Sequence, residues 1–193
     1  MTPAGQESDE QLARQARDGS DAAFAALVER HQSAAFNFAY RYLGDYDEAA
    51  DAAQNGFVQL FLSLPTLDLD RPIRPWLFRT IRNRAIDSIR QRRTVPLSAR
   101  DPEADDAIAS PDAMLADPDP LPDALVERAD LQQLLSAAIR RLPDRYRDVV
   151  ALRYTTDMTF GEMADALGVP ENTARIHFHR AKALLRRALR GLL

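Results

Sequence analysis

Hydrogen-bonding and cationic side chains follow Glu171 at helical spacing, so that they would share one face of a helix. Such a helix suits DNA, because amide and hydroxyl groups early in it can reach base edges and later cations can hold phosphates. From Glu171 to the C-terminus the chain carries six lysines or arginines and one acid. The residues that this pattern places on the predicted DNA-binding face are Asn172, Thr173, Arg175, Ile176, His177, His179, Arg180 and Lys182.

The residues just before this face have the spacing of a helix-turn-helix. Thr159 and Glu162 form a predicted capping box, Gly168 ends the first helix, and Pro170 suits the first turn of the second. The apolar residues expected to be buried on the second helix are Ala174, Phe178, Ala181, Leu185 and Ala188. Turn, cap and basic helix together favour nucleic acid over the alternative, an amphipathic helix with a solvated basic face.

A second cationic stretch runs from Arg71 to Arg93, with eight arginines and only Asp87 opposing them. Trp76 and Phe78 lie within it. An arginine-rich helix with aromatic rings can hold phosphates while unpaired bases stack or enter pockets. The alternative is that one or both rings belong to the core.

Between the two cationic stretches the composition changes, with six prolines from Pro96 to Pro122. The range Asp101 to Asp123 holds eight acids and no base, so the net charge of −4 becomes +4 over the rest of the chain (25 bases, 21 acids). Proline and self-repelling acids predict a flexible, largely disordered linker at residues 94–122. A further hypothesis is that these acids mimic DNA and discourage non-specific binding.

The remaining segments show helical periodicity, and no stretch alternates apolar and polar residues as a strand would. We expect helices from Asp9 to Leu43 with a break at Gly19, from Asp47 to Leu64, and from Asp123 through Tyr154 with a turn at Pro143. The fold class is therefore predicted to be all-α, with a first domain at 1–93, the linker at 94–122 and a helix-turn-helix domain at 123–193.

Several functional classes are disfavoured by composition. The chain has no cysteine, which excludes disulfides and thiolate metal sites and fits a reducing compartment. The sequence contains no run of about 18 apolar residues, which is the pattern that would predict a membrane-spanning helix. The three histidines, His31, His177 and His179, offer no credible metal set, and no group of residues resembles a catalytic site. We therefore expect a cytoplasmic protein without membrane insertion, cofactor, metal or enzymatic activity.

The ordered motifs resemble the sigma-70 family of bacterial RNA polymerase sigma factors, specifically the small extracytoplasmic-function (ECF) group. The resemblance covers about Asp9 to Arg93 and Leu131 to Leu189. It is carried by AFAALVERHQ at 23–32, AADAAQNGF at 49–57, PWLFRTIRNRAIDSIRQRR at 75–93, LPDRYRDVVALRY at 142–154 and RIHFHRAKALLR at 175–186.

The resemblance implies a dissociable subunit that binds core RNA polymerase, positions it on the minus-10 and minus-35 promoter elements and promotes melting. By position, core polymerase contacts would come from Asp51, Gln54, Asn55 and Phe57. Minus-10 contacts would come from Leu67, Asp68, Trp76, Arg79, Arg82, Asn83 and Arg90. Arg175 is the expected guanine contact in the minus-35 element. The residues that would read this element are Asn172, Thr173, Arg175, Ile176, His177 and Arg180.

The chain departs from the family at five of these positions. Asn55 stands where an acid is usual, Gly56 where a small branched residue is usual, and Leu67 where an aromatic is common. Ile176 and His177 replace what are commonly serine and arginine, which predicts an atypical upstream element. An anti-sigma factor is left open as a third partner. The alternative function is a two-domain helix-turn-helix regulator that does not associate with core polymerase.

Overall fold

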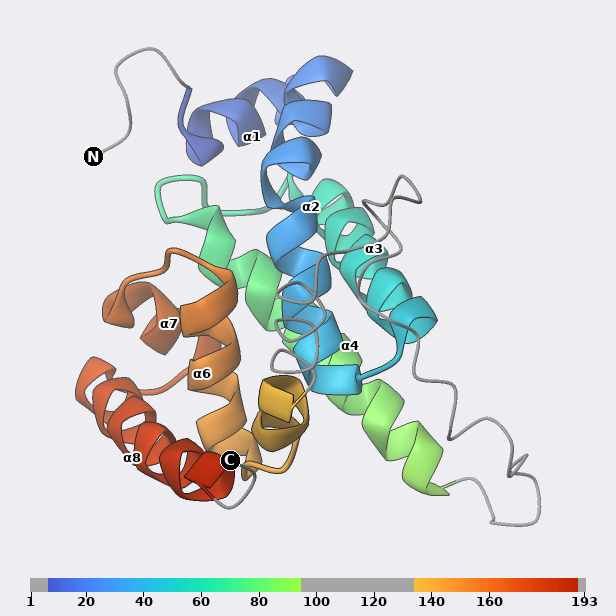
Figure 1. Cartoon of the computed structure of the whole chain (residues 1–193). Helices are drawn as coiled ribbons and strands as arrows, with labels where there is room; N and C mark the ends of the chain where they lie inside the picture. Colours follow the sequence, from blue (N-terminus) through green and yellow to red (C-terminus); the bar gives the residue numbers. More distant parts are fainter. Residues whose placement is uncertain (1–6, 95–133, 191–193) are drawn as a thin grey trace, which may run out of the picture.

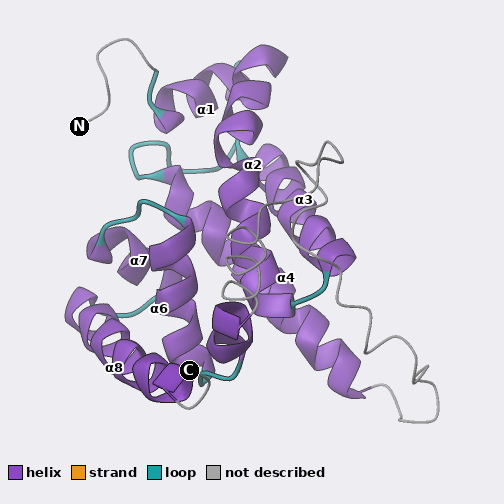
Figure 2. Ribbon diagram, viewed as in Figure 1, coloured by secondary structure: helices purple, strands orange, loops and turns teal. Residues whose placement is uncertain are grey.

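The computed structural model describes residues 7–94 and 134–190. Over these ranges the chain is helical and contains no strand, which confirms the all-α prediction (Figure 2). The helices are α1 (Asp9–Arg17), α2 (Asp21–Leu43), α3 (Tyr46–Ser63), α4 (Ile73–Thr94), a helical segment at 134–140, α6 (Asp144–Thr155), α7 (Phe160–Leu167) and α8 (Glu171–Arg190). Residues 95–122 of the predicted linker lie outside the described residues. So does the first part, residues 123–133, of the helix that was expected to begin at Asp123.

Short polar side chains set the starts of the helices. Ser8, Ser20 and Asp45 each accept a hydrogen bond from a backbone N–H in the first turn of α1, α2 and α3. The capping box predicted for α7 is present: Thr159 accepts from the Glu162 backbone, and Glu162 accepts from the Thr159 backbone. Each of these helices therefore begins where an otherwise unsatisfied amide finds a partner.

Glycine ends two of the helices. Gly44 follows α2 with φ 73°, and Gly168 follows α7 with φ 66°. Both values fall in the left-handed region, which a residue with a Cβ adopts only at a cost. Gly168 thus makes the tight turn that brings α8 back against α7, as the helix-turn-helix spacing predicted.

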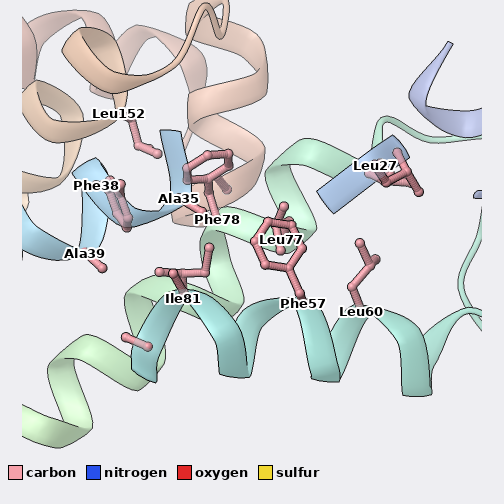
Figure 3. Packing of buried hydrophobic residues seen from close by; sticks show 14 of the residues in the cluster. Leu27, Ala35, Phe38, Ala39, Phe57, Leu60, Leu77, Phe78, Ile81 and Leu152 are labelled. Carbon is pink, nitrogen blue, oxygen red and sulfur yellow. The ribbon is translucent and has the colours of Figure 1, made fainter. Parts of the chain in front are cut away.

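The N-terminal half packs α2, α3 and α4 around one apolar core (Figure 3). Leu27, Phe38 and Leu60 are among its fully buried side chains, and the ring centroids of Phe38 and Phe78 lie 5.6 Å apart, edge to face. Phe78, for which the sequence left two interpretations, is therefore a core residue with 1% of its surface exposed.

The C-terminal half has its own smaller core, where Ile139, Val149 and Val150 meet the inner face of α8. On that face Ala174, Ala181 and Leu185 are buried as predicted, and Phe178 is half-buried. Ala188 is exposed, so the prediction that it is buried was wrong. Leu189, the next residue along α8, is half-buried and packs against this core instead.

The two halves are in contact and share part of the larger core. Figure 1 shows α6 and α7, in orange, beside α2 and α4, in blue and green. The residues that α6, α7 and the loop between them add to the N-terminal core are Ala151, Leu152, Met158, Met163 and Ala166. In the part of the chain that the structure describes, no helix is both long enough and apolar enough to cross a membrane.

Candidate functional site

An apolar groove of about 810 Å³ runs between α2 and α3. Aromatic and aliphatic side chains of both helices line it: Phe24, Val28 and Phe36 from α2, and Tyr46, Phe57, Val58, Phe61 and Leu62 from α3. Leu62 is 64% exposed, Phe61 49% and Val58 47%. A contiguous exposed apolar surface of this kind marks an interaction site, because water contact with it is unfavourable unless a partner covers it.

The groove gathers only part of the predicted polymerase-binding set. Gln54 and Phe57 line it, whereas Asp51 and Asn55 are not among its lining residues. Asp51 is exposed and Asn55 half-buried on neighbouring faces of α3. Sequence reasoning missed the contribution of α2 to this groove. Periodicity shows which residues share a face, but not whether another helix covers that face.

Gly56 lies on the opposite side of α3, where that helix meets α4. A Cβ on Gly56 would stand 2.4 Å from Cγ1 of Ile81. Ile81 is fully buried, so it has little room to move away. The departure from the family at Gly56 therefore has a structural reason: the isoleucine of α4 fills the volume that a larger residue would occupy.

A second cavity, of about 630 Å³, lies where the loop after α3 meets α4. It brings together four residues of the predicted minus-10 set: Leu67, Asp68, Trp76 and Arg79. Trp76 is half-buried, so one side of the indole packs on the core while the residue also lines the cavity. Asp165 of α7 also lines this cavity.

The other three predicted minus-10 residues lie outside this cavity. Asn83 is exposed further along α4. The Arg90 side chain is 75% exposed, and its Nη1 lies 3.8 Å from Asp87 Oδ1. Arg82 is directed to the C-terminal half, where its Nη2 donates to Asp148 Oδ2 at 2.7 Å. The structure thus divides the predicted set between a cavity, an exposed helix face and an interface between halves.

Arg74 and Arg79 also reach across to the C-terminal half. Arg74 Nη2 donates to Glu162 Oε1 at 2.6 Å. Arg79 donates through Nε to the carbonyl of Ala166 at 3.1 Å and through Nη2 to the carbonyl of Asp165. These carbonyls belong to the last turn of α7, where the helix dipole favours a cation. Sequence reasoning did not single out Arg74, although it belongs to the same arginine run.

Asp148 is the buried acid of this interface, with 3% of its surface exposed. Burial raises the pKa of Asp148 to about 8, because desolvation disfavours the charged carboxylate. The Arg82 guanidinium at 2.7 Å acts in the opposite direction by stabilising the carboxylate. The ion pair favours the ionised acid, because a guanidinium at hydrogen-bond distance stabilises the carboxylate more than the neutral carboxyl group. Among residues 7–94 and 134–190, Asp148 Oδ1 and Arg82 Nε find no hydrogen-bond partner.

The face of α8 predicted to read DNA is mostly open to solvent. Asn172, Arg175, Ile176 and Arg180 are exposed, and Thr173 is half-buried. Arg175 is held in place: its Nε and Nη2 donate to Glu171 Oε1 at 3.1 and 2.6 Å, and its guanidinium carbon lies 4.8 Å from the centre of the Phe160 ring. The structure therefore presents most of the predicted minus-35 residues together on one accessible surface.

His177 differs from its neighbours on α8 because it is half-buried. Its ring packs edge to face on Tyr146, with centroids 5.6 Å apart. Burial lowers the pKa of His177, and the nearby charges of Arg145 and Arg180 lower it further. A neutral imidazole packed in this way is suited to a hydrogen bond and less suited to holding a phosphate by charge.

These surfaces can be compared with those of known proteins. Residues 27–95 match the family described as Sigma-70 region 2, and residues 132–185 match the family described as Sigma-70, region 4. The RNA polymerase sigma factor NccH of Alcaligenes xylosoxydans xylosoxydans is 32% identical over 183 residues, which are 92% of this chain and 92% of NccH. The chain belongs to the sigma-70 family. The ECF RNA polymerase sigma factor SigW of Bacillus subtilis (strain 168) is 29% identical over 179 residues, 93% of this chain and 95% of SigW, which indicates the ECF group.

Solved structures of sigma factors share the fold. The structure of CnrH in complex with the cytosolic domain of CnrY has a TM-score of 0.71 and 26% identity, and the match covers 96% of this sigma factor and 99% of CnrH. The sigma factor RpoE of Bartonella quintana, solved with the anti-sigma factor NepR, has a TM-score of 0.63 at 19% identity, with 86% and 96% covered, and supports the fold alone.

The family assignment confirms the predicted function. As an ECF sigma factor, the chain directs RNA polymerase to promoters and promotes the initiation of transcription. Sigma factors are non-catalytic regulatory subunits. The alternative of a regulator unconnected to polymerase is disfavoured, because residues 27–95 match region 2 as a separate family in addition to the helix-turn-helix half.

Proposed function

We propose that this sigma factor divides its work among three surfaces: the groove between α2 and α3 binds core polymerase, the cavity at the start of α4 receives a minus-10 base, and the outer face of α8 reads the minus-35 element. The observation that carries the proposal is the cavity. Four residues assigned to the minus-10 element from sequence position alone lie around it.

The groove supports polymerase binding through its shape and composition. Three large apolar side chains that are about half exposed or more line it next to Gln54 and Phe57. An amphipathic helix from the polymerase could lay its apolar face there, as helices do in comparable grooves. Asp51 and Asn55 then flank the contact and contribute to its polar rim.

The minus-10 cavity supports base selection through its mixed lining. Leu67 and Trp76 offer apolar contact to the faces of a base, and Asp68 offers a hydrogen-bond acceptor. Extruding a base from the stack costs a few kcal/mol, which such a pocket can offset for the base that fits it. Asn83, Arg82, Arg79 and Arg90 would hold the strand that carries the base.

The α8 face supports minus-35 recognition by combining a cation that neighbouring side chains hold with a second cation that is exposed to solvent. Arg175 is oriented by Glu171 and Phe160, as a base contact requires. Arg180 is exposed and can follow the phosphate backbone. Asn172, Thr173, Ile176 and His177 complete the surface, with His177 acting as a neutral group.

We further infer that this sigma factor makes and breaks no bond itself, works in the cytoplasm, and uses neither metal nor cofactor. Among the described residues no cluster of three or more histidine or acidic side chains could hold a metal ion. CnrH is known in complex with the cytosolic domain of CnrY, and RpoE with NepR. On this basis we propose an anti-sigma factor as a third partner, and the apolar groove offers it a binding surface.

The polymerase contact can be tested by adding a charge to the groove. Leu62→Asp places a carboxylate on a side chain that is 64% exposed, so the fold should persist while the apolar contact is lost. Binding to fluorescently labelled core polymerase should weaken at least about tenfold, since burying an unpaired charge costs more than the 1.4 kcal/mol of a tenfold change. Leu134→Asp is the matched control, because Leu134 is also exposed (38%) but lies outside the groove. If Leu62→Asp bound core polymerase as tightly as Leu134→Asp does, the groove would be excluded as the polymerase-binding surface.

The two DNA contacts can be tested by transcription with core polymerase on a promoter library. Arg175→Ala should weaken selection of the upstream element, and Asn83→Ala should impair the choice of the minus-10 base while leaving upstream binding intact. Loss of both activities to the same extent in each variant would contradict the proposed division between α8 and α4.

A further inference from the structure

The loop between α3 and α4 carries Leu67 and Asp68, two of the residues around the minus-10 cavity. This loop runs beside α1 (Figure 1). We propose that Arg14 of α1 is a positioning residue for the choice of the minus-10 base, because it fixes the peptide unit that orients the Asp68 carboxylate. This inference rests on the proposed role of the cavity in minus-10 binding.

A single peptide unit connects Arg14 to Asp68. Arg14 Nη2 donates to the carbonyl oxygen of Leu69 at 2.7 Å. The N–H of Asp70 belongs to the same peptide unit as that carbonyl, and it donates to Asp68 Oδ1 at 3.1 Å. Since a peptide unit is planar, an oxygen held on one edge fixes the direction of the N–H on the other edge. The guanidinium of α1 therefore sets the direction of a hydrogen bond that the Asp68 carboxylate accepts.

Arg14 makes a second contact with the loop, which is the weaker of the two. Its Nη2 lies 2.8 Å from Asp70 Oδ1, but the Asp70 side chain is 91% exposed and the Arg14 side chain 42%. An ion pair this open to water contributes little, because solvent screens the charges and both side chains lose freedom. The bond to the Leu69 carbonyl is partly buried and holds the backbone itself. We therefore assign the positioning to the carbonyl contact.

The helix that carries Arg14 is itself fixed on α2. The Asp9 carboxylate joins the two helices, with Oδ2 lying 2.8 Å from His31 Nε2 and Oδ1 accepting from Arg30 Nη1. Leu12, on the inner face of α1, is 4% exposed. The ion pair and the apolar contact together hold α1 in one place. A donor on such a helix can fix a loop, whereas a donor on a mobile segment would follow the loop.

The loop is held by the core on one side of Asp68 and by α1 at its backbone. The side chains of Leu69 and Ile73 are buried, with 4% and 1% exposed. The Ile73 N–H also donates to Glu10 Oε1 of α1, at 3.4 Å. Helix α1 thus contacts the loop at two backbone groups, and the contact from Arg14 is the shorter one.

Asp68 depends on hydrogen bonds for its orientation, because it is exposed and the core does not hold its side chain. Its second oxygen, Oδ2, lies 3.4 Å from Arg71 Nε, and that arginine side chain is 84% exposed. A polar side chain on an exposed loop samples several rotamers unless a hydrogen bond selects one. The N–H of Asp70 is the better placed of the two donors, so the orientation of its peptide unit decides where the carboxylate points.

The direction of the Asp68 carboxylate matters for the choice of base and much less for holding the strand. A carboxylate accepts hydrogen bonds from the donor groups of a base, and such a bond weakens steeply when distance or angle departs from the optimum. Phosphate contacts from the arginines of α4 do not depend on which base is inserted. Loss of positioning should therefore lower the preference for one base while transcription itself continues.

The test measures base preference in transcription by the full sigma factor with core polymerase, on promoters randomised over the minus-10 element. The preference at a position is the transcript from the best base divided by the mean of the other three. Asp68→Ala removes the acceptor and should lower the preference about tenfold at one position, which identifies the base that enters the cavity. Arg14→Met keeps the unbranched stem but has no donor, and should lower the preference there about threefold, since the acceptor is displaced but present.

The double variant distinguishes positioning from an independent effect. If Arg14 acts through Asp68, Arg14→Met should change the preference by less than about 1.5-fold once Asp68 has been replaced by alanine. A defect that only loosened the fold would lower transcription from all promoters alike and leave the preference unchanged. Arg14→Gln decides the outcome if Arg14→Met does not fold by circular dichroism.

Two further variants serve as controls. Arg17→Met removes the same charge from the same helix; Arg17 is exposed and, within residues 7–94 and 134–190, makes no hydrogen bond or ion pair. Its preference should stay within about twofold of the wild type, as expected for an exposed position. Arg14→Lys also carries several donors on one nitrogen, as Arg14 Nη2 does, and should keep the preference within about twofold.

Four results would overturn the positioning role. These are an unchanged preference in folded Arg14→Met, an equal loss in Arg17→Met, an equal loss in folded Arg14→Lys, and full additivity of Arg14→Met and Asp68→Ala. Failure of the proposed function gives a different result: Asp68→Ala then leaves the preference unchanged at every minus-10 position, and the role of Arg14 falls with the cavity. If Asp68→Ala lowers the preference and folded Arg14→Met does not, only the positioning by Arg14 is wrong.

Discussion

Among single residues, Gly56 is one whose size is limited by one neighbour, Ile81. Adding a Cβ there would bring it to 2.4 Å from Ile81 Cγ1. Overpacking of a buried contact costs about 1–3 kcal/mol, and the better helix propensity of alanine returns up to about 1 kcal/mol. Gly56→Ala should therefore lower the free energy of unfolding by roughly 1–2 kcal/mol, measured by urea denaturation.

The partner residue supplies the control for this prediction. Ile81→Ala removes the atom that clashes and leaves a cavity, which is destabilising by itself. The double variant should be more stable than the sum of the two single changes predicts, because each change relieves the defect of the other. Strict additivity would show that the contact between Gly56 and Ile81 is not what limits the size of residue 56.

Two arginines of α8 should differ in the kind of DNA contact they make. Arg175 is held by Glu171 and Phe160, whereas Arg180 is exposed. Arg175→Ala should lose about 1–3 kcal/mol of discrimination between a selected upstream duplex and a scrambled one. Arg180→Ala should weaken both duplexes alike and reduce the slope of log affinity against log salt by about 1. Anisotropy titrations at several salt concentrations measure both effects. Loss of discrimination in Arg180→Ala, with only a reduced salt slope in Arg175→Ala, would contradict the assigned roles.

At the scale of elements, the short helix α7 depends on its cap. It spans only Phe160–Leu167, and its start is fixed by the reciprocal bonds of Thr159 and Glu162. Thr159→Ala should cost about 1 kcal/mol of unfolding free energy and increase amide hydrogen exchange in α7. Thr155→Ala is the matched control, because the Thr155 hydroxyl donates within its own helix to the carbonyl of Ala151 and caps nothing. Similar exchange in both variants would contradict a special role for the cap.

At the scale of the whole molecule, polymerase binding should be accompanied by separation of the halves. The chain has no cysteine, so cysteines introduced at the exposed positions Glu29 and Ala188 can carry a donor and an acceptor dye. Energy transfer should fall when core polymerase is added and stay unchanged with upstream duplex alone, because the outer face of α8 is accessible while the two halves are in contact. Leu62→Asp should suppress the fall. Unchanged transfer in the transcription-competent complex would show that the halves stay together.

The helical class, the capping box of α7, the turn at Gly168 and the outward face of α8 could all be predicted from the amino-acid sequence. These features depend on local chemistry: helical periodicity, side chains that bond nearby amides, and a backbone angle that favours glycine. The sequence also placed Leu67, Asp68, Trp76 and Arg79 in one functional set, through the resemblance to the sigma-70 family. Their common cavity is the structural counterpart of that assignment.

Which apolar faces are covered, and which arginines are bonded to the other half, became visible once the helices were packed together. Phe61 and Leu152 are both large apolar residues within predicted helices. Phe61 is nevertheless half exposed in a groove, whereas Leu152 is buried against the other half. Arg79 and Arg90 belong to one arginine run, yet Arg79 binds the end of α7 and Arg90 lies beside Asp87. Burial and ion pairing depend on contacts between residues far apart in the chain, and helical periodicity carries no information about those contacts.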